Sequence, residues 1–350
     1  MTDDSGIQEE RTLIELGPNR YGKCAIRLVK VSRSTSRTRI RDLSVSISLE
    51  GDFTAAHVAG DNAGVITTDT MKNTTYAFAH EHLTGSIEAF GLVLAEHFRA
   101  LPQVSTATVS ISEHGWEPLP TAAGPAPDAF LRTGELVRTA LVQAGPAGVT
   151  TESGLEELTL MKSAGSAFGG FPRDEYTTLA ETDDRLMASR LSASWRFGSV
   201  PVDADQTFDS VCRTLFDVFA GHRSPSVQGT IWILGRAVLE THPEIDEIRL
   251  KMPNLHHWLV DLGRFGQDND REIFVATSEP YGLIEATVRR SAPIAEPEPI
   301  AEPEPITEPE PEPEPITEPE AEPIAEPVSA PVAPVKDVPV PAALAPAVLA

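Results

Sequence analysis

Proline and acidic residues are concentrated at one end of the chain, and this distribution limits where a folded core can form. Residues 291–350 contain 17 of the 30 prolines, 13 of the 52 acidic residues and no aromatic residue. Such a segment cannot bury enough apolar surface to offset the conformational entropy lost on folding. We therefore predict a folded body and a disordered tail, residues 292–350, in which alternating Glu and Pro favour polyproline II structure. A solubilising tail is favoured over a partner-binding arm.

The composition of the body excludes several classes of protein. The formal net charge of −24 is divided about equally between tail and body, so the body has no excess of Lys and Arg for binding nucleic acid or anionic lipid. No apolar run approaches the roughly 20 residues of a membrane-spanning helix. The acidic first residues differ from a secretory signal, and Cys24 and Cys212 are expected to be free thiols. We expect a cytoplasmic protein without nucleic-acid or membrane partners.

The hydrophobic periodicity of the body predicts strands and helices in the same order twice. Apolar residues alternate with polar ones in strands and recur every three or four positions in helices. In the first half, strands are predicted over residues 21–31, 41–51, 103–114 and 129–143, with a helix over residues 86–101. In the second half, strands are predicted over residues 155–163, 191–199, 244–253, 256–265, 271–277 and 283–290, with helices over residues 207–221 and 226–242.

This repeated order predicts an α+β protein built from two β-β-α-β-β units. The expected organisation is a flexible leader over residues 1–19, a first unit over residues 20–145 and a second unit over residues 146–291. No repeat of individual residues accompanies the repeated order. Open four-stranded sheets have exposed edges, and oligomerisation is one way to cover them.

Short motifs for phosphate binding, nucleophilic catalysis or zinc binding are absent from the sequence. The nearest metal candidate is His80-Glu81-His82, whose imidazoles could share a strand face, but surface or helix-capping histidines are favoured. His256 and His257 open a predicted strand, so their rings are expected to point to opposite faces. One could then serve a site while the other is packed or solvated.

Three stretches, residues 61–75, 168–185 and 253–256, are more polar than their surroundings. Each has a purely structural interpretation. Thr68 or Asp69 could cap a helix, which the sequence alone favours. Arg173 and Arg185 could form weak surface ion pairs, and Asn254 could cap a turn.

Together with other segments, these stretches resemble the urate oxidase family. The matching motifs are YGK at residues 21–23, ITTDTMKNT at 66–74, the long run at 158–185, SVQGT at 226–230, PNLHH at 253–257 and SEPYGLI at 278–284. The resemblance implies tandem tunnelling-fold units that assemble into a hollow homotetramer. It also implies oxidation of urate by O2 and water to 5-hydroxyisourate and hydrogen peroxide, without a metal or an organic cofactor, in purine degradation.

The resemblance also implies roles for individual residues, first in holding the substrate. Phe168 would stack on the purine ring, while Arg185 and Gln228 would bind its polar edges and the main-chain N–H of Val227 would add a donor. A guanidinium fork and an amide suit a planar anion that is rich in acceptors.

A second group would move protons. By the same resemblance, Lys23 and Thr68 would form a base dyad, with His256 extending the proton relay. Asp69 would flank the dyad, Thr68 would also contact the substrate, and Asn254 would hold oxygen or the attacking water. In the family the base dyad and the ring-binding residues come from different subunits.

Two alternatives remain at this stage. Another tunnelling-fold enzyme could act on a pterin or on GTP, although such enzymes typically use a glutamate anchor and often zinc. A non-catalytic purine-binding protein would need the ring-binding residues but not the base dyad.

Overall fold

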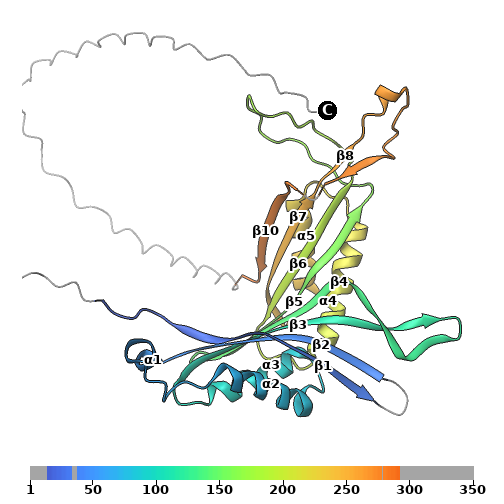
Figure 1. Ribbon diagram of the computed structural model, residues 1–350. Helices are drawn as coiled ribbons and strands as arrows, with labels where there is room; N and C mark the ends of the chain where they lie inside the picture. Colours follow the sequence, from blue (N-terminus) through green and yellow to red (C-terminus); the bar gives the residue numbers. More distant parts are fainter. Residues whose placement is uncertain (1–13, 34–37, 278, 292–350) are drawn as a thin grey trace, which may run out of the picture. The chain divides into compact units, whose positions relative to one another are not determined.

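The computed structural model describes residues 14–33, 38–277 and 279–291 (Figure 1). The predicted tail, residues 292–350, and most of the predicted leader lie outside the described residues. The described part contains an eight-stranded sheet in which neighbouring strands are antiparallel, in the order β1-β2-β3-β4-β5-β6-β7-β10. These strands are β1 (Arg20–Arg33), β2 (Thr38–Gly51), β3 (Val104–Thr121), β4 (Gly124–Gly145), β5 (Gly148–Lys162), β6 (Met187–Phe197), β7 (Ile245–Leu255) and β10 (Gly282–Arg289).

Helices cover one face of this sheet, and a small second sheet follows β7. The helices are α1 (Thr54–Ala59), α2 (Thr68–His82), α3 (Ile87–Arg99), α4 (Ala204–Gly221) and α5 (Val227–Thr241), with a 3-10 turn at Gly263–Phe265. The small sheet pairs β8 (His257–Leu259) with β9 (Phe274–Ala276). Figure 1 shows α2 and α3 against the strands of the first half, and α4 and α5 against those of the second. The predicted α+β architecture is confirmed.

The two predicted four-stranded sheets are continuous with one another. β4 and β5 pair antiparallel from Val137 opposite Glu156 to Gly145 opposite Gly148, so the sheet runs from one half into the next. Within the described residues this leaves β1 and β10 as the edges.

Alternation of side chains along the strands builds a separate core under each half. On β2, Leu43, Val45, Ile47 and Leu49 are all buried in the first core, whereas the residues between them are only half-buried. A second core packs β6 and β7 against α4 and α5, with Trp195 at 1% exposure. Burial of each such side chain stabilises the fold by about 1.5–3 kcal/mol.

The sequence indicated helix α2 only through a possible cap at Thr68 or Asp69, because its apolar stripe is narrow. Only Met71, Thr75 and Ala79 are buried along it. Its N-cap is Thr67, whose hydroxyl accepts the N–H of Thr70 at 3.0 Å, so the interpretation of Thr68 or Asp69 as the cap is wrong.

The His80-Glu81-His82 stretch also lies on α2, near its C-terminal end, rather than on a strand. Side chains two positions apart on a helix point in different directions, so the two imidazoles do not share a face. In the part of the chain that the structure describes, no group of three or more His, Cys, Asp or Glu side chains could hold a metal ion.

The structure reveals a residue-level repeat that the sequence reading missed. Three pairs with equal spacing occupy β1 and β5: Gly22 with Gly154, Ala25 with Glu157, and Lys30 with Lys162. A Cβ on either glycine would lie within 2.7 Å of a carbonyl oxygen on the next strand. Ala25 and Glu157 have φ of 54° and 61° at a bulge in each strand. Each lysine donates to the last carbonyls of a helix, α2 in one half and α4 in the other.

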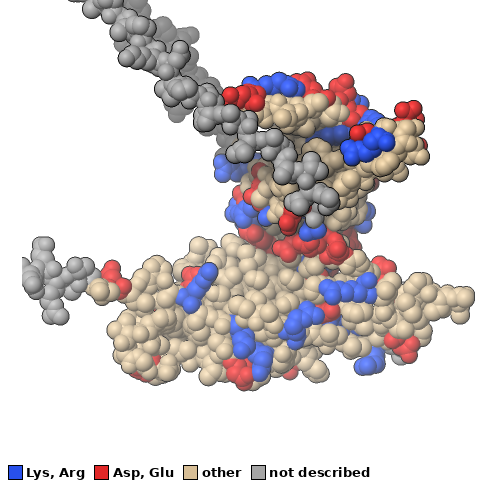
Figure 2. All heavy atoms as spheres, turned by 45° about the horizontal axis from the view of Figure 1, so that its top comes forward, with Lys and Arg blue, Asp and Glu red and all other residues tan. Residues whose placement is uncertain are grey.

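The surface agrees with the charge balance of the body. In the view of Figure 2, Lys and Arg side chains are interspersed with Asp and Glu side chains, and this face of the described residues shows no extended basic patch. No described helix is long and apolar enough to cross a membrane. Cys24 is exposed, Cys212 is buried, and both are free, as predicted.

Candidate active site

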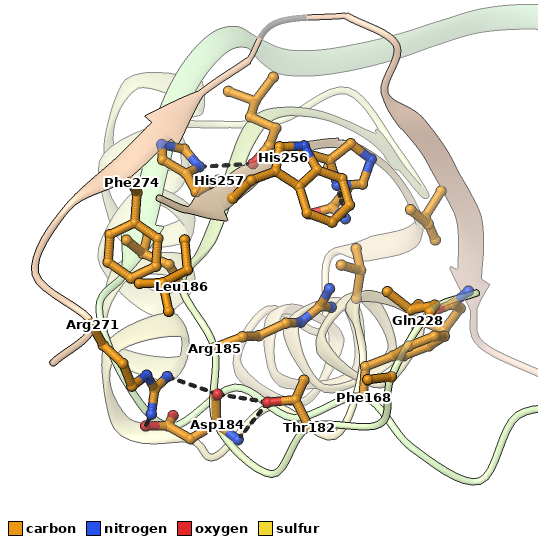
Figure 3. Close-up of a pocket in the computed structure, with 18 residues that line it drawn as sticks. Phe168, Thr182, Asp184, Arg185, Leu186, Gln228, His256, His257, Arg271 and Phe274 are labelled. Atoms are coloured by element: carbon orange, nitrogen blue, oxygen red, sulfur yellow. Dashed lines mark hydrogen bonds and ion pairs between the residues drawn. The ribbon is translucent and has the colours of Figure 1, made fainter. Parts of the chain in front are cut away.

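Most of the predicted site residues line a single cavity of about 660 Å³ in the second half of the body (Figure 3). They are Phe168, Arg185, Val227, Gln228, Asn254 and His256. They come from the β5–β6 connection, the start of α5 and the end of β7.

Phe168 and Arg185 lie on the long connection between β5 and β6. Phe168 and Thr182 exchange two main-chain hydrogen bonds, at 2.8 and 3.0 Å, and the N–H of Arg185 donates to the carbonyl of Ser166 at 2.6 Å. The ring of Phe171 stacks behind that of Phe168 with centroids 5.1 Å apart. The two ends of the connection are therefore held side by side.

The Arg185 guanidinium is unpaired among the described residues. Its Cζ lies 5.4 Å from the centroid of the Phe168 ring, its Nε has no hydrogen-bond partner, and burial lowers its pKa. The surface ion pairs expected for Arg185 and Arg173 are absent from the described residues, and Arg173 instead donates to the carbonyl of Leu179 at 3.1 Å. A desolvated guanidinium without a carboxylate favours a bound anion.

The start of α5 adds amide donors to the same cavity. Ser226 caps the helix by accepting the N–H of Gly229 at 3.1 Å, which leaves Val227 and Gln228 as the first helical residues. The first N–H groups of a helix have no partner within the helix and favour negative charge. The main chain of Ser224 fixes this end to the β5–β6 connection through two hydrogen bonds of 2.7 and 2.8 Å. We refer to Phe168, Arg185, Val227 and Gln228 as the clamp.

Asn254 and His256 approach the cavity from the end of β7. Nδ2 of Asn254 lies 3.5 Å from Nδ1 of His256, whose ring stacks on Trp258 at 5.3 Å. Both His256 and His257 line the cavity. β7 ends at Leu255 and β8 begins at His257, so the alternation of a strand does not extend across His256.

Several lining residues were not singled out from the sequence. Arg271, Trp258 and Phe274 belong to the segment around β8 and β9 and enclose the cavity beside Leu186 and His257. Their own stretch of sequence is rich in Asp, Asn and Arg and carries no motif that indicates a site.

Lys23, Thr68 and Asp69, which we call the base group, are gathered elsewhere. Lys23 lies on β1 and Thr68 is the first residue of α2. A hydrogen bond and the charge of Lys72 lower the pKa of Asp69, and the nearby charge of Lys23 lowers it further. The Tyr21 hydroxyl, two residues before Lys23, donates to the carbonyl of Ile66, two residues before Thr68, at 3.3 Å, so β1 lies against the start of α2.

The base group and the clamp are far apart within one chain. β1 forms one edge of the sheet, and five strands separate it from β7. Neighbouring strands lie about 4.8 Å apart, so the separation along the sheet is roughly 30 Å. Within one chain, the base group and the clamp therefore do not lie in the same cavity.

Comparisons with known proteins agree on one family. The Uricase family model matches residues 19–143 and 151–285. The uricase of Arthrobacter globiformis is 47% identical over 286 residues, which cover 81% of this chain and 93% of that protein. Its crystal structure superposes with a TM-score of 0.77 and covers 82% of this chain and 99% of its own. The uricase of Dictyostelium discoideum is 34% identical and covers 80% of this chain and 98% of its own length. The chain belongs to the uricase family.

Proposed function

We propose that the chain is a urate oxidase that converts urate, O2 and water to 5-hydroxyisourate and hydrogen peroxide. The observation that carries the proposal is the unpaired Arg185 guanidinium beside the Phe168 ring, at the N-terminal end of α5. Urate is a planar anion whose edge carries carbonyl oxygens and ring N–H groups. A cationic fork, an aromatic face and amide donors match each of these properties.

The clamp binds the purine before chemistry begins. Arg185 and the Gln228 side chain form hydrogen bonds with the polar edge, Val227 donates its main-chain N–H, and Phe168 stacks on the ring. A heterocycle that lacks these acceptors leaves the clamp donors unpaired, so discrimination against it is expected to be steep.

The base group removes a proton from urate. Thr68 passes the proton from the substrate to Lys23, His256 extends the relay, and Asn254 holds O2 or water above the ring. The resulting dianion is electron-rich and transfers electrons to O2, which becomes hydrogen peroxide, while oxygen from water is added to the purine. The proposed reaction uses no metal or organic cofactor.

We further propose that a second copy of the chain supplies the base group to the clamp. The separation of roughly 30 Å along the sheet motivates this arrangement. The two edge strands, β1 and β10, offer unpaired main-chain groups to other copies. We propose a hollow homotetramer in which each subunit consists of tandem units over residues 20–145 and 146–291. The exposed free thiol of Cys24 suits a reducing compartment such as the cytoplasm.

Urate consumption separates this proposal from its alternatives. Loss of the ultraviolet absorbance of urate should be accompanied by an equal amount of hydrogen peroxide, and a chelator should leave the rate unchanged. Binding of urate without turnover would instead favour a purine-binding protein. Loss of activity on chelation would point to a metal-dependent enzyme of the same fold.

Mixing two inactive variants tests the shared site. Lys23→Ala removes the base and Arg185→Ala removes the clamp cation, so each homo-oligomer should be inactive. Oligomers reassembled from both variants should regain activity, because some sites then combine an intact base group with an intact clamp. No recovery in verified mixed oligomers would overturn the shared site.

A further inference from the structure

The spacing of Arg185 and Phe168 must be fixed by something other than a regular sheet or helix. Between β5 and β6 the structure has only isolated bridges, such as the one between Phe168 and Thr182. Main chain outside regular structure depends on other groups for its hydrogen bonds. One such group is the carboxylate of Asp184, the residue before Arg185.

Both carboxylate oxygens of Asp184 are engaged. Oδ1 accepts the N–H groups of Gly165, at 2.6 Å, and Ser166, at 3.4 Å. Oδ2 lies 3.2 Å from Nη1 of Arg271, whose Nη2 also donates to the Asp184 carbonyl oxygen at 2.7 Å (Figure 3). The guanidinium fork thus holds the side chain and the main chain of Asp184 together.

These contacts close the two ends of the β5–β6 connection on each other. Ser166, whose N–H is bound by Asp184, accepts the N–H of Arg185 through its own carbonyl at 2.6 Å. Phe168 follows two residues later, and its ring lies 5.4 Å from the Arg185 guanidinium carbon. The Asp184 carboxylate therefore lies at the junction that sets the distance between the stacking ring and the cation.

Arg271 is itself held in a constrained turn. Its φ of 66° lies in the left-handed region, which is uncommon for a residue with a Cβ. The N–H of Arg271 donates to the carbonyl of Asn269 at 2.7 Å, and the Asn269 side chain accepts the N–H groups of Glu272 and Ile273 at 3.0 and 3.1 Å. The turn holds the guanidinium toward Asp184.

The charges of the pair persist at neutral pH. The N–H of Gly165 foremost, followed by that of Ser166 and the charge of Arg271, lowers the pKa of Asp184. With a lowered pKa in the folded state, the contribution of Asp184 is present above its ordinary pKa of about 3.9 and is lost as the pH falls through the folded value.

We propose that Asp184 and Arg271 are positioning residues that fix the geometry of the clamp and thereby set its affinity for a planar purine anion. Arg271 also supplies a positive charge beside the Asp184 carboxylate, so Arg185 remains available to the ligand. This inference deepens the proposed function and rests on it in assigning urate to the clamp.

The neighbouring aspartate provides a matched control. Asp183 is exposed, and its carbonyl rather than its carboxylate is used, since Arg223 donates to that oxygen at 2.7 Å. Asp184→Asn and Asp183→Asn make the same change in charge and volume in the assembled enzyme. Asp184→Asn should raise both the KM for urate and the Kd for xanthine, a purine dione that serves as a binding probe, roughly ten-fold, because a charged hydrogen bond is weakened. The kcat should stay within about two-fold, and Asp183→Asn should match the wild type.

Arg271→Gln and the double variant with Asp184→Asn distinguish positioning from direct binding. If the two residues act as a pair, the double variant should bind xanthine about as weakly as Asp184→Asn alone. Full additivity would show that Arg271 binds the ligand itself and would overturn its assignment. Equal KM and Kd values for the Asp184 and Asp183 variants would overturn the whole inference.

Circular dichroism and a urate oxidation assay distinguish failure of the positioning pair from a failure to fold and from failure of the proposed reaction. If circular dichroism shows that Asp184→Asn does not fold, Arg271→Gln alone carries the test, because it leaves the hydrogen bonds from the N–H groups of Gly165 and Ser166 to the Asp184 carboxylate intact. Weakened xanthine binding in a protein that does not oxidise urate would support the positioning pair while refuting the proposed reaction. Unchanged xanthine binding in an active enzyme would refute the pair and spare the reaction.

Discussion

A buried ion pair in a network that joins the two halves of the body gives the sharpest prediction of stability. Glu88 on α3 is 2% exposed, and its Oε2 accepts Nη2 of Arg138 on β4 at 2.8 Å. Its other oxygen accepts the hydroxyl of Ser153 on β5 at 2.5 Å. Nη1 of Arg138 reaches Asp205 on α4 at 2.6 Å, so the network joins a helix of the first half to a helix of the second.

The environment of Arg138 determines the size of the effect. Burial lowers the pKa of its guanidinium, but the charges and hydrogen bonds of Glu88 and Asp205 outweigh burial and raise it. Removing one partner of a buried pair typically costs about 3–5 kcal/mol. Because the side chain of Asp205, 41% exposed, remains as a second partner, Glu88→Ala should lower the free energy of unfolding by about 3 kcal/mol.

A solvent-exposed ion pair with nearly the same N–O distance serves as a control for the effect of burial on stability. Arg236 and Glu240 on α5 are 2.7 Å apart, and both side chains are 61% exposed. Glu240→Ala should therefore cost only about 0.3–0.5 kcal/mol. Glu88→Gln, which keeps an acceptor and the shape of the side chain, should fall between the two variants.

Equilibrium unfolding in urea at one fixed protein concentration measures these differences, because an oligomer gains apparent stability with concentration. The assembly state of each variant is checked before unfolding by size-exclusion chromatography. A loss for Glu88→Ala no larger than that for Glu240→Ala would refute the reasoning from burial.

Two further predictions concern the first strand and the thiols. The Tyr21 hydroxyl donates to the carbonyl of Ile66 at 3.3 Å and so fixes β1 to the segment that leads into α2. Tyr21→Phe should lower kcat about 3- to 10-fold, whereas Tyr76→Phe on the exposed face of α2 should not, and equal rates in steady-state assays would contradict this role. Cys24 should react with a thiol reagent in the native protein, while Cys212, whose pKa burial raises to about 11, should react only after unfolding. Equal labelling of both cysteines without denaturant would show that α4 opens readily.

The sequence predicted those elements whose side chains alternate or repeat strongly. β2 was predicted because every second residue from Leu43 to Leu49 is apolar, and these residues are buried in the structure. α2 was indicated only by a possible cap, because three small or flexible buried residues in a run of threonines do not form a recognisable stripe. The continuity of the sheet through β4 and β5 depends on pairing between the halves, which periodicity within each half does not indicate.

The residues of the candidate site also include some that the sequence indicated and some that it did not. Phe168 and Arg185 were identified because one continuous motif carries both of them. The contact of Arg271 with Asp184 joins positions 87 residues apart, and neither position stands out in its own stretch. Contacts of this kind depend on where the β8–β9 segment lies in space, and a single sequence does not specify that.

The internal repeat explains why one chain would hold only incomplete sites. The equal spacing that relates Gly22 to Gly154 and Lys30 to Lys162 relates Lys23 to Leu155. Leu155 is fully buried in the second core, so the second half has an apolar side chain where the first has an amine. Conversely, the clamp depends on the long connection between β5 and β6, residues 163–186. The corresponding strands of the first half, β1 and β2, are separated in the sequence only by residues 34–37. The paired glycines and lysines that support the strands and helices are present in both halves. Lys23 is present only in the first half, and the clamp only in the second. If both groups act on one purine, as we propose, another copy of the chain has to bring the base group to the clamp.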